Sequence, residues 1–322
     1  MLKRTFLVAA AITLATISAH AAWPERPITL IVPWAAGGGT DAVGRIIAAG
    51  LEKELGKPVN VVNRTGGGGV VGHTEMINAK PDGYTIGLAT AEVTTYYWAN
   101  TAPYTYEKLS PIALVNFDNV AFFVAESSPW KTLGEALAAI KKDPPGTYKM
   151  SGMPVGAAYH LAFSRLLQTE GIDAKAVPVV PNQGAAQGFQ ELVSGGVQIL
   201  PSSLPEGRAM VDGKRAKVLA VLAAERVPAF ADVPTVKQAI GREVVGGTWR
   251  GVAGPAGLPD DVAARLMAAV EKVVSGPDFK NFMNDRGFGI AWAKGADFGT
   301  FLAEQHRNNG EVMSALGLRL RQ

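Results

Sequence analysis

The chain has 322 residues, 48% of them hydrophobic, which is enough for one large domain or for two smaller domains with buried cores. It contains no cysteine, so disulfide bonds, thiolate metal sites, a cysteine nucleophile and a lipid-modified N-terminal cysteine are excluded. The 31 lysines and arginines nearly balance the 28 aspartates and glutamates and form no basic block, which argues against nucleic-acid binding.

The N-terminus has the pattern of a secretory signal peptide over residues 1–21. Lys3 and Arg4 give a positive start, residues 6–17 form an apolar run, and Ala19-His20-Ala21 has the A-x-A form of a cleavage site. The apolar run is too short for a membrane anchor, and no second long apolar stretch follows it. We therefore predict export, cleavage after Ala21 and a location in the bacterial periplasm.

The mature chain opens with a predicted strand, 28–32, a glycine-rich turn and a helix over 41–55. The turn, residues 33–41, has the sequence PWAAGGGTD. Glycines let the backbone approach a ligand closely, and the first N–H groups of a helix have no partner within the helix. Together with the helix dipole they form a site for a carboxylate or a phosphate. Thr40 is placed to cap the helix or to bind a ligand oxygen.

Two glycine patterns resemble the dinucleotide-binding fingerprint, at residues 37–42 and 67–72. Such a site also needs an acidic residue at the end of the next strand, about twenty residues further on. The strand after the first pattern ends in Asn63, and Asp82 lies in a turn before a strand rather than after one. We therefore expect no nucleotide cofactor.

Short apolar runs then alternate with helical patterns, which predicts an α/β fold with parallel sheets. The expected strands are 28–32, 59–63, 85–89, 111–115, 121–124, 149–151, 176–178, 197–200, 218–222 and 251–253. The expected helices are 41–55, 70–79, 132–142, 156–169, 184–195, 205–212, 260–275 and 277–285.

Two segments without helical periodicity, 115–128 and 218–227, are suited to carry the chain between two lobes. We predict a first lobe of residues 24–122 and 225–322, a second lobe of residues 123–224, and a two-crossover hinge with a cleft between them. In the second lobe, Ser151-Gly152 and Asn182-Gln183-Gly184 precede helices. They either present amides to a ligand or serve as ordinary helix caps.

Catalytic signatures are sparse in this chain. It has no G-x-S-x-G elbow and no HExxH motif, and His73, His160 and His306 are not spaced as metal ligands. We interpret His160, on an amphipathic helix, as structural. The expectation is a protein without catalytic residues, metal or cofactor, and an exported enzyme is the weaker alternative.

The segment WPERPITLIVPWAAGGGTDAVGRIIAAGLEKELGKPVNVVNRTGGGGVVG, followed by AKPDGYTIGLAT, resembles the solute receptors of tripartite tricarboxylate transporters, the Bug receptors. The likeness continues in RAKVLAVLAAERVPAFADVPTVKQA and GVAGPAGLPDDVAARL. It implies a type II periplasmic binding protein whose two lobes close on a small carboxylate, a di- or tricarboxylate or another organic acid. It also implies delivery to a permease with one large and one small membrane subunit, or a sensing role. We expect the receptor to be a monomer.

The resemblance also implies site residues by position. One ligand carboxylate would be held by the loop from Ala36 to Thr40, and Thr90 would line the cleft. In the second lobe, Ser151 and the amides at Gly184 and Ala185 would hold the other end. The candidate ligand-binding residues are Trp34, Ala36, Gly37, Gly38, Thr40, Asp41, Thr90, Ser151, Gly156, Asn182, Gly184, Ala185, Ser202 and Arg250.

Three positions depart from the family pattern. The loop 153–156 is longer and more apolar than is usual. Ser202 stands where many members have an aspartate, and the missing acid argues against amino-acid ligands. Arg250 stands where an aromatic or another residue is usual in the family. It is either a bidentate partner of a ligand carboxylate or a surface arginine, and we favour the surface arginine.

Overall fold

The computed structural model describes residues 23–152 and 155–321. The predicted signal peptide, its cleavage site at Ala21, and Met153 and Pro154 of the apolar loop lie outside the described residues. The strands are β1 (Ile28–Val32), β2 (Val59–Asn63), β3 (Thr85–Thr90), β4 (Leu109–Ala125), β5 (Met150–Gly152), β6 (Val179–Pro181), β7 (Leu200–Ser203), β8 (Ala216–Val221), β9 (Gly247–Pro255) and β10 (Ile290–Lys294). The helices are α1 (Gly39–Leu55), α2 (Val70–Ile77), α3 (Leu133–Lys142), α4 (Ala158–Thr169), α5 (Ala185–Val193), α6 (Arg208–Asp212), α7 (Val236–Ile240), α8 (Asp260–Ser275), α9 (Pro277–Arg286) and α10 (Gly295–Ala315).

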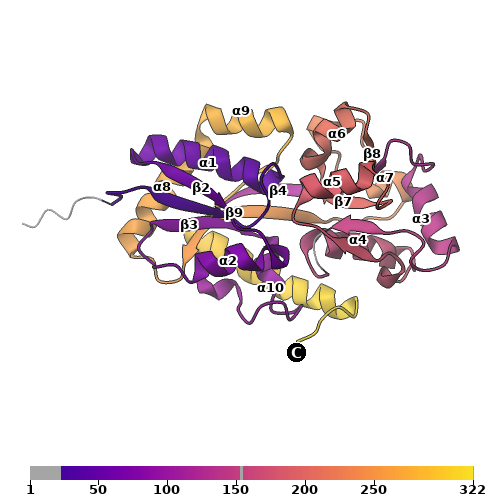
Figure 1. Ribbon diagram of the computed structural model, residues 1–322, viewed down its shortest axis with the longest axis horizontal. Coiled ribbons are helices and arrows are strands. Elements are labelled where there is room, and N and C mark those ends of the chain that lie inside the picture. Colours follow the sequence, from indigo (N-terminus) through magenta and orange to yellow (C-terminus); the bar gives the residue numbers. More distant parts are fainter. Residues whose placement is uncertain (1–22, 153–154, 322) are drawn as a thin grey trace, which may run out of the picture.

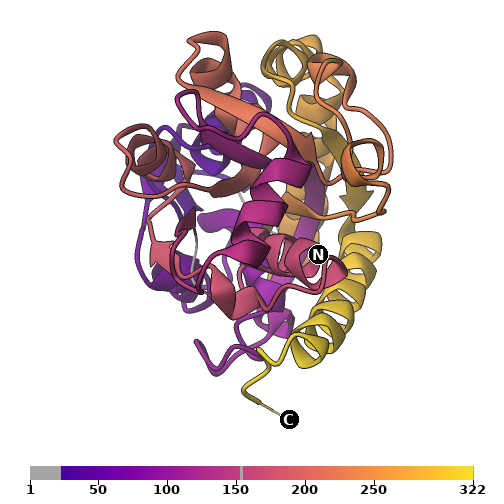
Figure 2. The same ribbon diagram turned by 90° about the vertical axis from the view of Figure 1, so that its right-hand side faces the viewer.

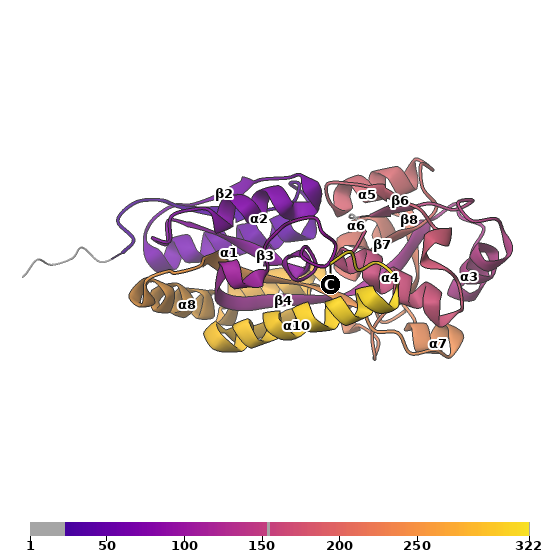
Figure 3. The ribbon, with the colours of Figure 1, turned by 90° about the horizontal axis from the view of Figure 1, so that it is seen from below.

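The strand β4 runs through both halves of the molecule (Figures 1 and 3). The main sheet has the order β10-β4-β9-β3-β1-β2, and β7 and β8 pair with the other end of β4. β5 and β6 form a separate parallel pair in the second half. The predicted parallel arrangement holds for β1, β2 and β3, but β9, β4 and β10 are antiparallel to their neighbours.

The prediction of two separate strands, 111–115 and 121–124, is wrong, because β4 is one strand from Leu109 to Ala125. The sequence between the predicted strands contains Asn116, Asp118 and Asn119, and its polarity favours a connection between the lobes. In the structure Asn116 and Asp118 are buried inside the strand, where they have hydrogen-bond partners. Buried polar groups are tolerated when they are paired, so polarity did not mark a loop here.

The helix α1 positions the glycine loop at the edge of the first half. Its residues Val43, Ile47 and Leu51 recur at helical spacing and are fully buried in one hydrophobic core with β1 and α8. Gly56 ends the helix in a left-handed conformation at φ 66°, which glycine adopts without steric cost. The N-terminus of α1 is thereby fixed at the carboxyl end of β1.

The last helix, α10, lies along one side of the molecule (Figure 2) and extends below β4 towards α4 (Figure 3). It packs against β4 and β10, and the carbonyl of Ala315 at its end accepts a hydrogen bond from Gln168 Nε2 of α4 at 3.4 Å. α10 therefore contacts both halves. Among the described residues no helix combines the length and the hydropathy needed to cross a membrane.

The second crossing between the halves is made by β9. The short helix α7 packs against α3 and β8, which belong to the second half. The amide of Val120 donates to the carbonyl of Gly246 at 2.9 Å, just before β9 starts to run back along β4. β9 therefore starts to run back towards the first half at Gly247, and the lobe boundary at residue 225 stays a prediction.

Candidate functional site

The glycine loop is held in shape by Asp41, in the first turn of α1. Its carboxylate accepts hydrogen bonds from Gly37 N and from Asn63 Nδ2, each at 3.0 Å, and pairs with Arg45. Burial would raise the pKa of Asp41, but these three partners outweigh it and lower the pKa. Gly37 has φ 84° and is exposed with Ala36 at the tip of the loop. Asp41 therefore shapes the loop.

The glycine loop meets the second half of the molecule directly. Ala35 N donates to the carbonyl oxygen of Gln183 at 3.1 Å. Behind this contact, Asn182 Nδ2 donates to Ser151 Oγ at 2.9 Å, and Asn182 Oδ1 accepts from Gly184 N at 3.0 Å. The two second-lobe loops singled out in the sequence are thus joined to each other and to the first lobe.

Arg250, on β9, is the centre of a buried polar network. The prediction of a surface arginine is wrong, because only 2% of this residue is exposed. Its guanidinium donates to Thr40 Oγ1 at 3.0 Å, Asn116 Oδ1 at 2.5 Å, Asp118 Oδ2 at 2.6 Å and Glu206 Oε1 at 3.2 Å. Burial would lower the pKa of Arg250, but the charges of Asp118 and Glu206 outweigh it and raise the pKa. Arg250 is therefore charged and paired.

Glu206 is the member of this buried network that the sequence analysis missed. It lies on the short 3₁₀ turn Leu204–Gly207 after β7, and its carboxylate reaches the N-terminus of α1. Gly39 N donates to Oε1 at 2.9 Å, while Tyr159 OH and Ser202 Oγ donate to Oε2 at 2.7 and 2.8 Å. The one local signal was an acid four residues after Ser202 at the end of a strand.

The contact with Glu206 gives Ser202 a structural partner that the sequence analysis did not predict. The missing aspartate at position 202 argues against amino-acid ligands, but Ser202 brings a different carboxylate to this place, because its hydroxyl donates to Glu206 Oε2 at 2.8 Å. With Arg250, that carboxylate has four donors, two on each oxygen. All four acceptor sites of the Glu206 carboxylate are therefore used, and none is left for the amino group of a ligand. The exclusion of amino-acid ligands remains a prediction, now because this carboxylate is occupied.

Trp34 and Thr90, two of the predicted site residues, lie next to each other in a buried position. Trp34 Nε1 lies 3.4 Å from Thr90 Oγ1, which donates to Glu92 Oε2 at 2.5 Å. The other oxygen of Glu92 accepts from Ala158 N, at the start of α4, at 3.4 Å. Burial raises the pKa of Glu92, which is 1% exposed. This group joins the two halves behind the glycine loop.

A cavity of about 440 Å³ lies between the two halves, with α1 and α9 on one side and α5 and α6 on the other (Figure 1). Three of the predicted residues line it, namely Gly37, Gly38 and Ala185. The residues Gly39, Ala186 and Glu206 line it as well. The N-termini of α1 and α5, one from each half, therefore open into the same space.

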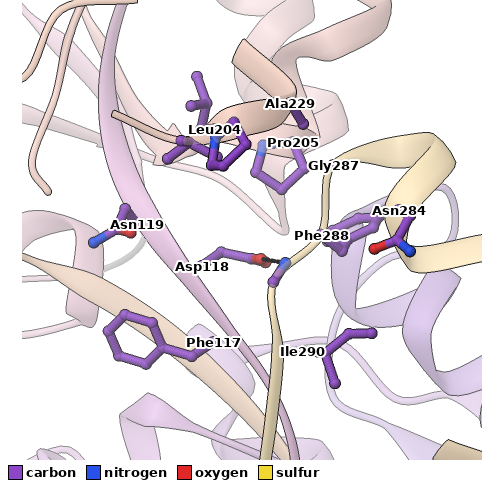
Figure 4. A pocket seen from close by; sticks show the side chains of 13 residues that line it. Phe117, Asp118, Asn119, Leu204, Pro205, Ala229, Asn284, Gly287, Phe288 and Ile290 are labelled. Carbon is purple, nitrogen blue, oxygen red and sulfur yellow. Dashed lines mark hydrogen bonds between the residues drawn. The ribbon is translucent and has the colours of Figure 1, made fainter. Parts of the chain in front are cut away.

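A second cavity of about 390 Å³ lies next to the first, at the point where β4 crosses between the halves (Figure 4). Figure 4 shows Asp118 of β4 pointing towards the segment between Phe288 and Ile290. In that segment Gly289 N donates to Asp118 Oδ1 at 2.8 Å. Pro205 and Phe288 line both cavities and separate them. The second cavity thus borders the crossing strand that carries Asp118.

Gly156 and His160 lie away from both cavities. The position of a Cβ on Gly156 is 3.0 Å from Met313 Cε of α10, and its φ is 90°. Gly156 N donates to Nδ1 of His160, and burial lowers the pKa of that histidine to about 4. Gly156 therefore packs closely against α10 in this structure. Within residues 23–152 and 155–321, no cluster of histidine, aspartate and glutamate is suited to hold a metal ion.

The chain matches the family model of the tripartite tricarboxylate transporter family receptor over residues 43–318. It is 27% identical to the periplasmic binding protein BugD, with a TM-score of 0.85 over 92% of this chain and 99% of that one. It is 26% identical to MatC of Rhodopseudomonas palustris with bound malate, with a TM-score of 0.82 over 90% and 99% of the two chains.

A ligand-free solute-binding protein of the same family from Polaromonas is 32% identical, and its TM-score is 0.66 over 91% of this chain and 99% of that one. The superposition is therefore closer with the malate-bound relative than with this ligand-free one, although the identity is lower. The two-lobe α/β fold predicted from the sequence is confirmed by these structures. The family and these neighbours are solute-binding receptors, and the chain belongs to the receptor family of the tripartite tricarboxylate transporters.

Proposed function

We propose that this protein is a periplasmic receptor for a small organic acid anion, which it delivers to a tripartite tricarboxylate-type permease of one large and one small membrane subunit. The observation that carries the proposal is the cavity of about 440 Å³ into which the N-termini of α1 and α5 open from opposite lobes. Helix N-termini bind anions through unpaired amides and the helix dipole. The malate bound by the related MatC supports an organic acid as the ligand class.

Binding is coupled to closure because the ligand touches both lobes. Gly38 in the first lobe and Ala185 in the second line the same cavity, so a ligand bound there stabilises the closed arrangement over the open one by its differential affinity. Closure removes water from the cavity and strengthens the hydrogen bonds to the carboxylate. The permease then distinguishes loaded from empty receptor by the arrangement of the lobes.

A thermal-shift screen of residues 22–322 tests this proposal. The ligands are mono-, di- and tricarboxylates, aromatic acids, amino acids and nucleotides, each at a hundred times its dissociation constant where solubility allows. Binding at that ratio stabilises the folded state by about 2.7 kcal/mol. Stabilisation by carboxylates supports the receptor function, whereas stabilisation by nucleotides alone contradicts it. Size-exclusion chromatography of the same sample tests the expected monomer.

A further inference from the structure

Glu206 occupies the position that a ligand carboxylate is expected to take at the N-terminus of α1. Its two oxygens accept four hydrogen bonds, from Gly39 N and Tyr159 OH among others, and the side chain is 6% exposed. A Cβ on Gly39 would lie 2.6 Å from Glu206 Oε1 and 2.7 Å from Arg250 Nη2. A side chain at residue 39 would therefore exclude the carboxylate, and glycine permits the close approach.

The charge of Arg250 is already balanced by this arrangement. Arg250 is the one fully buried lysine or arginine among the described residues, and it pairs with Asp118 at 2.6 Å and with Glu206 at 3.2 Å. These groups together carry a negative charge. A second carboxylate brought to the same place by a ligand would meet like charges and would find Arg250 already paired with two carboxylates, which is costly for a buried charge.

The charged side chains around the cavity do not offer an excess of positive charge either. Arg208 and Arg286 line it together with Asp212, Asp285 and Glu206. Arg208 is paired with Asp212 at 3.6 Å. The acids outnumber the bases by one, so each additional ligand carboxylate increases the repulsion.

The remaining walls of the cavity are suited to one carboxylate and a hydrocarbon body. Ala42, Phe189, Met210 and Phe288 supply apolar surface from α1, α5, α6 and the segment after α9. The start of α5 has no side-chain cap and no acidic residue in its first turn. The amides of that turn are therefore the place for the ligand's single carboxylate, opposite the turn of α1 that Glu206 already occupies.

We propose that Glu206 determines ligand specificity by supplying a built-in carboxylate at the N-terminus of α1, so that the receptor selects monocarboxylates with an apolar body over dicarboxylates. This inference rests on the proposed receptor function and narrows its ligand class. Glu206 belongs to the second lobe and Gly39 to the first, so the same contact helps to hold the lobes together without a second ligand carboxylate.

Matched pairs of acids test the inference by isothermal titration calorimetry on the mature protein. Hexanoate and adipate have the same chain length, and benzoate and terephthalate share a ring; within each pair only the number of carboxylates differs. We expect the wild-type protein to bind the monocarboxylate of a pair at least tenfold more tightly. Tighter binding of the dicarboxylates overturns the inference while leaving the receptor function intact. Failure of every organic acid to bind overturns the receptor function itself.

The variant Glu206→Gln removes the charge and keeps the shape of the side chain. We expect its affinity for adipate or terephthalate to rise at least tenfold, and its affinity for the monocarboxylate partner to stay within threefold. Glu304→Gln, on the exposed face of α10, is the matched control and leaves both affinities unchanged. An unaltered ratio in Glu206→Gln overturns the role of Glu206. The wild-type comparison remains decisive for the ligand class if the variant does not fold.

Discussion

Arg250 shows how strongly one buried side chain depends on its partners. Its guanidinium pairs with Asp118 of the long strand β4 and with Glu206 of the turn after β7. It also donates to Thr40 Oγ1 at the start of α1. Removing one member of a buried ion pair leaves an unpaired charge without water. The network is therefore expected to stabilise the closed arrangement and to align the glycine loop with the second lobe.

Replacing Arg250 with methionine, which has a similar length, leaves Asp118 and Glu206 buried without their cation. We expect the free energy of unfolding to fall by about 3–5 kcal/mol. Urea denaturation followed by circular dichroism measures the change. Arg165→Met on the exposed side of α4 serves as the control and should cost well under 1 kcal/mol. A loss as small for Arg250→Met as for the control would contradict the network's role.

A larger side chain at Gly38 would test whether the cavity that this residue lines is the ligand-binding site. A Cβ at this position would have Ala35 O at 3.7 Å as its nearest neighbour, and the backbone is extended at φ −85°. Gly38→Leu is therefore tolerated by the fold while it fills the cavity, and we expect ligand binding to be lost with little change in melting temperature. Gly134→Leu in α3, where the nearest atom is 3.9 Å away, is the control. Normal affinity in Gly38→Leu would remove the loop from the site.

The short helix α7 is stabilised by a capping motif that is visible in the sequence. It has five residues and lies in the connection that precedes β9. Thr235 and Gln238 form a reciprocal capping box, with Gln238 N donating to Thr235 Oγ1 at 3.2 Å and Thr235 N donating to Gln238 Oε1 at 3.1 Å. Such caps satisfy N–H groups that a helix cannot pair internally.

The isosteric change Thr235→Val removes the capping hydroxyl and keeps the side-chain volume. Because the hydroxyl is buried and accepts from Gln238 N, we expect a loss of about 1 kcal/mol in the free energy of unfolding. Thr300→Val, an exposed position in α10, is the matched control with almost no loss. Equal denaturation midpoints for the two variants would show that the cap does not support α7.

At the scale of the whole molecule, each lobe contributes a buried carboxylate that accepts a hydrogen bond from the other lobe. Glu206 of the second lobe accepts from Gly39 N at the start of α1, and Glu92 of the first lobe accepts from Ala158 N at the start of α4. One hydrophobic core also includes residues of both lobes, such as Trp34 and Phe163. Each lobe therefore completes a helix terminus of the other, and closure satisfies groups that would otherwise face water.

Two buried histidines, His73 and His160, are expected to make the stability of the protein depend on pH. Burial lowers the pKa of His73 and of His160 to about 4, so both are neutral in the folded state, while in the unfolded chain they become protonated near pH 6.5. The unfolded state then binds more protons, and stability falls as pH drops from about 6.5 to 4, by roughly 1.4 kcal/mol per pH unit for each histidine. The raised pKa values of Glu92 and Asp118 act in the opposite direction.

The contribution of one histidine is measured by comparing wild type with His160→Asn in urea denaturation at several values between pH 7 and pH 5. Asparagine retains an acceptor close to the Nδ1 position that Gly156 N contacts. We expect the variant to have a smaller slope of unfolding free energy against pH, because one proton-binding group of the unfolded state is gone. Identical slopes would show that His160 is not kept neutral by burial.

The sequence by itself determined the elements whose signals are local. The strand, glycine turn and helix from Ile28 to Leu55 follow from hydrophobic periodicity and from glycine's freedom at Gly37, and the family resemblance rested on the same residues. The tertiary structure alone decided which polar groups meet. Glu206 and Arg250 are 44 residues apart, and the polar stretch around Asp118 is a strand because its partners come from distant segments. Burial of a charge depends on groups brought together by folding, and no local pattern encodes that pairing.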